Sequence, residues 1–272
     1  MIVITRANGL ELRLLQDGPE IAAAQALRYQ VFYEEMGAVP SPAMAASGRD
    51  ADRYDAIADH LVVVDLERTA GDSGPCVVGC YRMLRESVAR RHGERLYTAG
   101  EFDLAGVRSP YGELMELGRS CVGAEYRTGA AMALLWRGIA DYLEAYQVGL
   151  MLGCASLPGT NPDAAAPALS YLHHHHLAPP ELRPRALPER RVDSDRLAPD
   201  RYDARQVSRH LPPLLKAYLR IGGMIGDGAV ADEQFNTIDV CLVLPTATVK
   251  LRSPRLFRHQ QQEGLPAVPA AA

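Results

Sequence analysis

The chain of 272 residues contains only two lysines, Lys216 and Lys250, so arginine carries almost all of its positive charge. The formal net charge is −4, which excludes a general nucleic-acid binder because phosphate binding requires net basicity or a clustered basic face. No uninterrupted apolar run approaches the roughly 18 to 20 residues that span a bilayer. Residues 1–15 lack the basic start and apolar middle of a signal peptide. We therefore expect a cytoplasmic protein, with peripheral contact at the inner membrane face as the alternative.

Other chemistries are disfavoured by missing motifs. The five cysteines are an odd number without C-x-x-C spacing, which favours buried, reduced thiols over a disulfide framework. The chain has no G-x-S-x-G motif and Cys121 has no paired histidine nearby in the sequence, so covalent catalysis is disfavoured. The histidines at 173–176 fall in an expected helix, where successive side chains point in different directions and cannot converge on one ion. We expect no metal.

Composition indicates one domain with an extension. The hydrophobic fraction of 47% can fill a sizeable core, and 23% of the residues are charged. We predict a single domain over residues 1–250 with an Arg/Pro-rich insertion at 178–210, followed by a flexible tail at 251–272. Between Arg183 and Arg209 eight arginines stand against five acidic residues, a flank suited to an acidic partner.

Hydrophobic periodicity predicts an α/β fold. Alternation and apolar runs predict strands at 10–15, 60–65, 76–84, 114–122, 148–155 and 237–245. Apolar residues at helical spacing predict helices at 19–37, 128–146, 164–176 and 212–222. The strands at 60–65 and 76–84 flank a turn-rich break, which predicts an antiparallel hairpin. Pro40 and Pro42 indicate a mobile loop.

Glu116 is a single acidic residue inside the apolar strand at 114–122, with Arg119 three residues further on. A carboxyl group buried there has a raised pKa and can accept a proton from an ammonium substrate, a role that contributes roughly 10²- to 10⁴-fold. The alternative is an outward-facing, inert side chain. Glu116 is therefore the candidate general base, and Arg119 is the candidate residue that orients it.

Two further segments are candidates for binding. The turn at 123–131 leads from strand to helix, where free backbone N–H groups bind anions and Gly129 allows close approach by a phosphate or pantetheine arm; a plain turn with a packing glycine is the alternative. An acidic run, made of Asp50, Asp52, Asp55 and Asp59, precedes the strand at 60–65, with Arg28 upstream and Arg82 downstream. It is either a solvated loop or a set of carboxylates that line a cleft for a cationic group.

The order of these elements resembles the GNAT acyltransferase fold, a mixed, mostly antiparallel central sheet flanked by helices, here with an Arg/Pro-rich C-terminal extension. The signature of that family has Gln or Arg three residues before the first glycine of the turn, where this chain has Tyr126. This departure is typical of relatives that take acyl chains from acyl carrier protein. The resemblance implies that the pantetheine arm of the donor is bound by Tyr126, Arg127, Thr128, Gly129 and Ala130.

Four shorter strings, LRYQVFYEEMG, DRYD, GCYRML and MELGRSCV, resemble the acyl-homoserine-lactone synthases. In those enzymes an Arg and a Phe of the first helix, two aspartates, a strand arginine and a Glu-x-x-Arg surround the amino-donor and acyl pocket. The matching residues in this chain are Arg28, Phe32, Asp52, Asp55, Arg82, Glu116 and Arg119.

Longer strings, among them DHLVVVD, AEYRTGAAMALLWRGIADY and SYLHHHHLAP, are similar to the L-ornithine Nα-acyltransferases over about residues 10–246. This resemblance implies a bacterial enzyme of ornithine-lipid biosynthesis that moves a 3-hydroxyacyl chain from acyl carrier protein to the α-amine of L-ornithine, forming lyso-ornithine lipid. It implies no cofactor beyond the phosphopantetheine that the acyl carrier protein brings. It also makes the histidine run a family feature.

The same resemblance suggests roles for the charged residues. Asp52 or Asp55 would pair with the side-chain ammonium of ornithine, and Arg28 or Arg82 would bind its carboxylate. Acyl carrier proteins are acidic, so the predicted docking surface is basic and consists of Arg183, Arg185, Arg190 and Arg191. Three alternatives remain: an N-acyl amino acid synthase for another amino acid, an acyl-homoserine-lactone-like signal synthase, and a non-catalytic acyl-carrier or membrane adaptor.

Overall fold

The computed structural model describes residues 2–69, 74–253 and 255. Within this part of the chain, one mixed and mostly antiparallel sheet has the strand order β1-β2-β3-β4-β6-β7-β11-β10-β8-β5, with β9 paired to β10. The strands are β1 (Ile2–Ala7), β2 (Leu10–Leu15), β3 (Asp59–Asp65), β4 (Val77–Arg85), β5 (Phe102–Asp103), β6 (Glu113–Val122), β7 (Val148–Pro158), β8 (Arg185–Ala186), β9 (Arg191–Val192), β10 (Met224–Asp232) and β11 (Thr237–Pro245). The pairs β6–β7 and β8–β10 are parallel.

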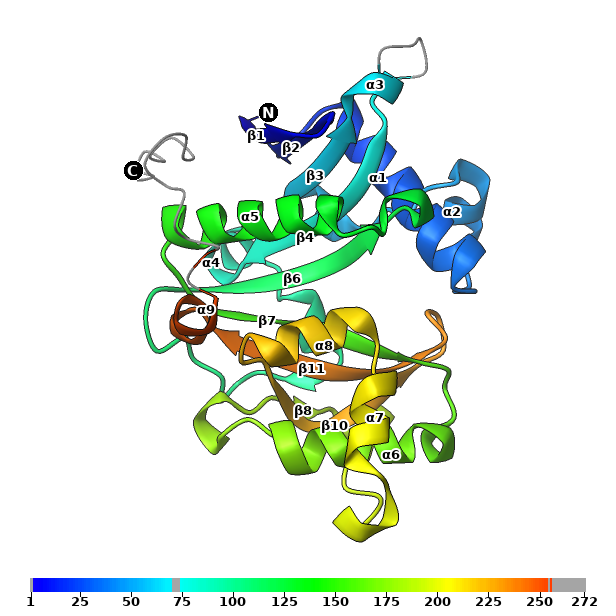
Figure 1. The fold of residues 1–272 in the computed structure, drawn as a ribbon, viewed down its shortest axis with the longest axis vertical. Coiled ribbons are helices and arrows are strands. Elements are labelled where there is room, and N and C mark those ends of the chain that lie inside the picture. Colours follow the sequence, from blue (N-terminus) through cyan, green and yellow to red (C-terminus); the bar gives the residue numbers. More distant parts are fainter. Residues whose placement is uncertain (1, 70–73, 254, 256–272) are drawn as a thin grey trace.

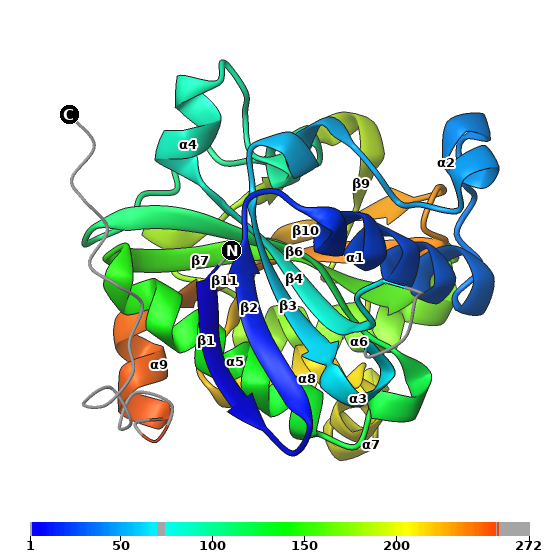
Figure 2. The same cartoon turned by 90° about the horizontal axis from the view of Figure 1, so that it is seen from above.

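Helices cover both faces of the sheet (Figures 1 and 2). They are α1 (Pro19–Tyr29), α2 (Pro42–Ser47), α3 (Leu66–Thr69), α4 (Glu86–Arg91), α5 (Ala130–Ala145), α6 (Pro162–His176), α7 (Ala204–His210), α8 (Pro213–Arg220) and α9 (Thr246–Arg252). Helices α1 and α4 pack on one face, and α5, α6 and α8 pack on the other. None of the helices in the described part of the chain combines the length and the apolar character that crossing a membrane would require.

The predicted hairpin is confirmed, because β3 and β4 pair antiparallel along most of their length. Both strands are buried on both faces, which explains why they read as continuous apolar runs in the sequence. The other predicted strands and helices are also present, with ends that differ by a few residues. Helix α1 continues into a π-helical turn, Gln30–Glu35, which completes the predicted helix at 19–37.

The prediction of a mobile loop around Pro40 and Pro42 is wrong, because residues 42–47 form the short helix α2. Ser41 caps its N-terminus by accepting a hydrogen bond from the backbone N–H of Met44, and Pro42 occupies the first helical turn, where its missing N–H costs nothing. Gly48 ends the helix in the left-handed conformation, with φ of 61°. Two prolines therefore start and precede a helix here rather than marking a loop.

Strand β10 is absent from the sequence-based prediction, because Gly226 and Gly228 interrupt its pattern. Gly228 has a φ of 80°, and the register with β11 shifts between Ile225 and Ala229, as expected for a bulge. The Arg/Pro-rich segment at 178–210 is only partly irregular. It supplies β8 and β9, which pair with β10 at the edge of the sheet, and helix α7.

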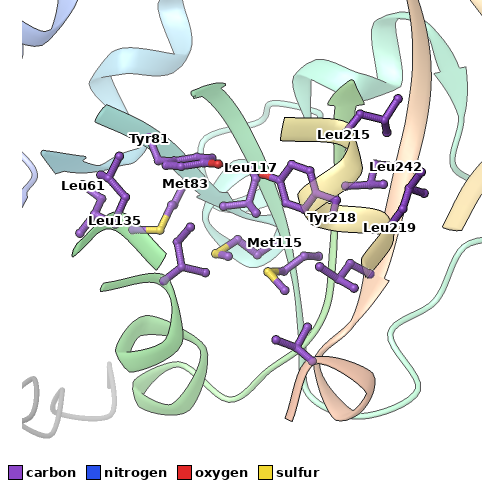
Figure 3. Packing of buried hydrophobic residues seen from close by; sticks show 14 of the residues in the cluster. Leu61, Tyr81, Met83, Met115, Leu117, Leu135, Leu215, Tyr218, Leu219 and Leu242 are labelled. Carbon is purple, nitrogen blue, oxygen red and sulfur yellow. Dashed lines mark hydrogen bonds between the residues drawn. The ribbon is translucent and has the colours of Figure 1, made fainter. Parts of the chain in front are cut away.

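The predicted domain boundary at residue 250 falls inside helix α9, which ends at Arg252. The predicted flexible tail lies outside the described residues at 254 and from 256 onward. The main hydrophobic core lies between the sheet and helices α5, α6 and α8. Figure 3 shows its centre, where Tyr81 and Tyr218 meet beside Leu117.

Candidate active site

Four neighbouring strands present polar side chains on one face of the sheet. These are Arg82 of β4, Glu116 of β6, Cys154 of β7 and Asp239 of β11. Directly paired residues share a face and side chains alternate along a strand, so the registers of β4–β6, β6–β7 and β7–β11 place all four on the same side. The opposite face carries the apolar core under α5 and α8.

The sheet opens between β6 and β7. The two strands pair in parallel only as far as Glu116 and Leu152, although both continue for several residues. At the branch point stands Gly153, where a Cβ would clash with the carbonyl oxygen of Leu117. A cavity of about 800 Å³ occupies the opening. The backbone of β6 beyond Glu116 faces this cavity and offers N–H groups where a developing oxyanion needs donors.

The cavity has a polar and an apolar part. The polar part lies on the face of Glu116 and includes Arg82, Tyr97 and Arg119. The apolar part is formed by helices α5 and α8 and strand β11, from the side chains of Met132, Trp136, Leu214, Leu215, Tyr218, Leu242 and Leu244. In Figure 3, Tyr218 of α8 and Tyr81 of β4 point toward one another, and their hydroxyl groups are 3.2 Å apart. A cavity of this form suits an acyl chain on one side and a polar acceptor on the other.

Glu116 has the properties of a general base. Its side chain is 5% exposed, and its Oε2 accepts a hydrogen bond of 3.3 Å from the backbone N–H of Thr98. Burial raises the pKa of Glu116 to about 7, against the opposing charges of Arg82 and Arg119. The group is therefore divided between its ionised and protonated forms near neutral pH, as a proton acceptor should be.

Three arginines and three aspartates form a buried cluster next to Glu116. Arg28 donates two hydrogen bonds to Asp55 (2.8 and 3.0 Å), one to the carboxylate of Asp50 (2.8 Å) and one to the backbone carbonyl of Asp50. Further ion pairs join Arg82 to Asp52 and Asp55, and Arg119 to Asp50 and Asp52. Burial alone would raise the pKa of Asp55, but the hydrogen bonds and charges of Arg28 and Arg82 hold it well below its usual value. The charges of the cluster balance.

A β-bulge explains how Arg119 joins this cluster. In a regular strand, residues three apart point to opposite faces, so Arg119 would point away from Glu116. The register of β4–β6 shifts between Cys80 and Arg82, and Arg119 adopts a positive φ of 50°. The bulge turns the guanidinium onto the face of Glu116, between the rings of Tyr97 and Phe235 at 5.0 Å each.

The cluster engages several residues for which the sequence predicts other contacts. The hydrogen bonds of Arg119 go to Asp50 and Asp52, and Glu116 accepts one from the N–H of Thr98. Arg28 is 1% exposed and its guanidinium is bound by Asp50 and Asp55, so its binding of a substrate carboxylate stays a prediction. Within the described part of the chain, the cavity wall includes Phe32 and Arg82 but not Arg28, Asp52 or Asp55.

The predicted pantetheine turn lies at one end of the cavity. Tyr126, Arg127 and Gly129 line the wall, whereas Thr128 and Ala130 do not. Gly129, with φ of 102°, precedes α5, and no side chain caps that helix. The first N–H groups of α5 therefore stay available to a phosphate. Arg127 bridges to Glu35, with 2.6 Å between Nη2 and Oε2, and closes the turn.

The arginines predicted to dock a carrier protein lie around β8 and β9, near the edge of the sheet opposite to β1. Arg185 is exposed. Arg183 donates to the carbonyl of Ala178, Arg190 donates to the carbonyl of Ala231, and Arg191 pairs with Asp193 and Asp227. Three of the four thus also hold the edge of the sheet together. Their role in docking stays a prediction.

The histidine run ties α6 to the Arg/Pro-rich segment. His173 hydrogen-bonds to Ser194, and the two ring nitrogens of His174 bond to Asp195 and Tyr202. These neighbouring side chains diverge toward different partners, as successive helical positions should.

Sequence reasoning missed four parts of the site. They are Asp50, Tyr97, the Tyr81–Tyr218 hydroxyl pair, and a buried acidic group made by Glu101 and Asp239. Asp50 was visible as part of the acidic run, but it has no counterpart among the motifs that carried the resemblance. The others come from segments that are distant in sequence and meet only in the folded chain.

The chain is similar to several known proteins. The acetyltransferase (GNAT) domain model matches residues 27–137. The chain is 45% identical over 247 residues to the L-ornithine N(alpha)-acyltransferase of Agrobacterium fabrum, covering 90% of this chain and 83% of that protein. It is 44% identical over 252 residues to the protein of the same name from Rhizobium meliloti, covering 92% and 84%. Among solved structures, FeeM, an N-acyl amino acid synthase from uncultured soil microbes, aligns with a TM-score of 0.49 at 12% identity, covering 91% of this chain and 97% of that one.

Proposed function

The chain belongs to the L-ornithine N(alpha)-acyltransferase family, and on this premise we propose that it transfers a 3-hydroxyacyl chain from acyl carrier protein to the α-amine of L-ornithine. The product is lyso-ornithine lipid. The observation that carries the proposal is the buried carboxyl group of Glu116 at the mouth of the opening between β6 and β7. This position lies between the polar and the apolar parts of the cavity, where an amine and a thioester carbonyl would meet.

The transfer needs one proton acceptor, one oxyanion site and one proton donor. Ionised Glu116 takes a proton from the α-ammonium of ornithine, and the free amine attacks the thioester carbonyl. Backbone N–H groups of β6 beyond Glu116, where pairing with β7 has ended, would then stabilise the oxyanion. As the intermediate expels the pantetheine thiolate, the attacking nitrogen gives up its second proton and the thiolate takes up one. The paired hydroxyl groups of Tyr81 and Tyr218 are suited to relay that proton, because burial raises the pKa of both and keeps them protonated before and after the transfer.

Two observations support acyl carrier protein as the donor. The turn before α5 offers one arginine, Arg127, and its guanidinium is already paired with Glu35. The large anionic nucleotide of coenzyme A would need more cationic groups than this. A pantetheine arm with one phosphate needs only the uncapped N-terminus of α5 and the apolar wall beyond it.

Mass spectrometry of lipids from cells that express the protein, compared with cells carrying an empty vector, tests the proposal. Accumulation of 3-hydroxyacyl ornithine is the expected result. Another N-acyl amino acid would favour the alternative synthase, an acyl-homoserine lactone would favour the signal synthase, and no new acylated amine would favour an adaptor. Purified protein with acyl carrier protein thioesters and a panel of amino acids gives the same answer without cellular precursors.

A carrier-protein docking role for Arg183, Arg185, Arg190 and Arg191 predicts a specific kinetic change. Replacing all four by serine should raise the KM for acyl carrier protein severalfold and flatten its salt dependence, because exposed charges steer association and are screened beyond about 8 to 10 Å at physiological ionic strength. The KM for a short pantetheine thioester should not change.

The control is Arg90→Ser, which removes an exposed arginine of α4 paired with Glu86. Circular dichroism must show that the quadruple variant is folded, since Arg190 and Arg191 also hold the sheet edge; if it is not, Arg185→Ser alone provides the test. A quadruple variant, or a lone Arg185→Ser protein, that keeps the wild-type salt slope places the docking surface elsewhere.

We propose that the enzyme works in the cytoplasm and contacts the inner membrane face peripherally, because its product is an amphiphile. Met36 and Val39, which follow the π-helical turn after α1, are exposed by 51% and 63%, and Met36 also lines the cavity. Wild-type protein should therefore co-sediment with lipid vesicles, and Met36→Ser with Val39→Ser should reduce the bound fraction. Equal sedimentation of both proteins would contradict this contact.

A further inference from the structure

A second buried acidic group lies beside the cavity, on the same face of the sheet as Glu116. It consists of Glu101, Cys154 and Asp239, and one side-chain oxygen or sulfur atom from each lies within 4.8 Å of the others. The side chains of Glu101 and Asp239 are 3% and 6% exposed, and Cys154 and Asp239 line the cavity. Unlike the cluster around Arg28, this group is not charge-balanced. Glu101 forms an ion pair with Arg190, with 3.7 Å between Oε1 and Nη1, while Asp232 adds a further carboxyl group near Glu101.

One carboxylate oxygen of this group, Oδ1 of Asp239, lacks a hydrogen-bond partner among the described residues. Asp239 and Thr237, two residues before it on β11, both line the cavity. A buried acceptor without a donor lowers stability, so such an atom marks a place where a ligand can supply the missing donor. Here the missing donor must be a group that enters the cavity and carries N–H or O–H hydrogens.

We propose that Glu101 and Asp239 bind the side-chain ammonium of the ornithine acceptor. The inference rests on the proposed function and replaces Asp52 and Asp55, whose charges are already matched by arginines. An alkylammonium has three N–H donors, and the carboxylates of Glu101 and Asp239 with the hydroxyl of Thr237 offer the acceptors.

The position relative to Glu116 fits a short diamino acid. Thr98 connects the two sites, because its N–H donates to Glu116 and its hydroxyl lies 3.8 Å from the sulfur of Cys154. That thiol in turn donates to Glu101 at 3.2 Å. Along β7, Cys154 lies two residues beyond the partner of Glu116, roughly 7 Å at the rise of a strand. The α-amine at Glu116 and the side-chain ammonium at Glu101 would be separated by a similar span.

A metal ion fits this group less well. Metal ligation by cysteine requires the thiolate, but burial and the neighbouring charge of Glu101 raise the pKa of Cys154 well above its usual value, and its thiol donates to Glu101. The remaining carboxyl groups give too few ligands for a closed site. An ammonium needs no thiolate and is bound by the acceptors alone.

The group also predicts proton release. Burial, with the charge of Asp239, raises the pKa of Glu101 to about 7, and burial raises the pKa of Asp239. A bound ammonium lowers both values, so binding releases protons and strengthens as the pH rises through about 7. The titratable and charged groups that face the pair are Asp232, Arg190, Cys154, Cys241, Tyr97 and Glu116.

The test compares ornithine with norleucine, which has the same length but no side-chain ammonium. Asp239→Asn should raise the KM for ornithine by about 10- to 150-fold, the range expected for a lost charge-assisted hydrogen bond, and leave the KM for norleucine nearly unchanged. Glu101→Gln should act in the same direction. Asp141→Asn is the matched control, because Asp141 is a buried acid of α5, paired with Arg137, outside the cavity wall.

Isothermal titration calorimetry of ornithine without an acyl donor supplies a second measurement on the wild type. Titration near pH 6.5 in buffers of different ionisation enthalpy should show proton release that Glu101→Gln reduces. Retained discrimination in both variants, loss of discrimination in Asp52→Asn alone, or a metal that co-purifies with wild type and not with Asp239→Asn would overturn the assignment. Wild-type protein that binds ornithine through Asp239 but acylates nothing would instead contradict the proposed function.

Discussion

Replacing Glu116 by glutamine is expected to leave the fold intact and to lower kcat by about 10²-fold or more. The amide keeps the shape of the side chain and its acceptor oxygen for the N–H of Thr98, but it cannot take a proton from the ammonium. Steady-state kinetics at saturating ornithine and acyl carrier protein measure the effect. The KM for acyl carrier protein should change little, because Glu116 lies on the acceptor side of the opening.

The pH dependence of the wild type gives an independent readout of the same group. Only ionised Glu116 accepts a proton, and its pKa is raised to about 7 by burial, so kcat/KM should rise with pH through about 7. Glu101 titrates in the same range and affects ornithine binding, so the two groups are separated at saturating ornithine: the rise of kcat with pH should persist in Glu101→Gln and vanish in Glu116→Gln.

Stability must move in the opposite sense. A carboxyl group with a raised pKa stabilises the folded state fully below its unfolded value of 4.5, and this contribution is lost as the pH rises through about 7. Glu116→Gln, which is neutral at all pH values, should therefore be at least as stable as the wild type at pH 8.

Glu113→Gln, on the same strand, is the control for the loss of turnover in Glu116→Gln and should keep full activity. Undiminished turnover in Glu116→Gln would assign the base to another group.

The parts of the fold that the sequence predicted are those with strong local patterns. Strand β3 is a continuous apolar run between acidic residues, and α5 has apolar residues at helical spacing over 16 residues. Strand β10 escaped because its two glycines, needed for a bulge, weaken the pattern of a strand. Helix α2 escaped because its prolines were interpreted without the serine cap and glycine end around them.

The site was predictable to the extent that single residues stand out in a strand. Glu116 is an acid in an apolar segment, and this alone singled it out. The partners of the aspartates could not be found in that way, since the ion pairs of Asp50 and Asp52 with Arg119 join residues 69 and 67 positions apart. The orientation of Arg119 depends on a β-bulge, which the residue types around Arg119 do not predict. Glu101 directly precedes β5 and meets Asp239 of β11 only in the folded sheet, where β5 pairs with β8, β8 with β10 and β10 with β11.

The cluster around Arg28 also determines how the acceptor pocket keeps its shape. Asp50 and Asp55 come from a segment with little regular structure, and Arg28 fixes both to α1. Through Asp50 and Asp52 the same cluster holds Arg119, whose guanidinium lines the cavity. Arg28, at the centre of this network, therefore holds Arg119 in the cavity wall without lining the cavity itself.

Arg28→Met is expected to lower the free energy of unfolding by about 3 to 5 kcal/mol, the range for a buried ion pair that loses one partner. The methionine fills part of the volume but leaves Asp50 and Asp55 buried with one cation fewer. Urea denaturation at pH 7 measures the loss. Arg90→Ala, which breaks the exposed pair with Glu86, is the control and should cost no more than about 1 kcal/mol.

The sign of the pH effect distinguishes a lost ion pair from lost packing. Asp55 has a depressed pKa, so its contribution to stability is present above its unfolded value of 3.8 and is lost as the pH falls toward the folded value. The wild type should therefore lose stability on acidification below about pH 4. Arg28→Met, which keeps only the part of this contribution that comes from Arg82, should lose less. Parallel stability curves for the two proteins between pH 7 and pH 3 would show that Arg28 acts by filling space, and the cluster could then not be what holds Arg119 in the cavity wall.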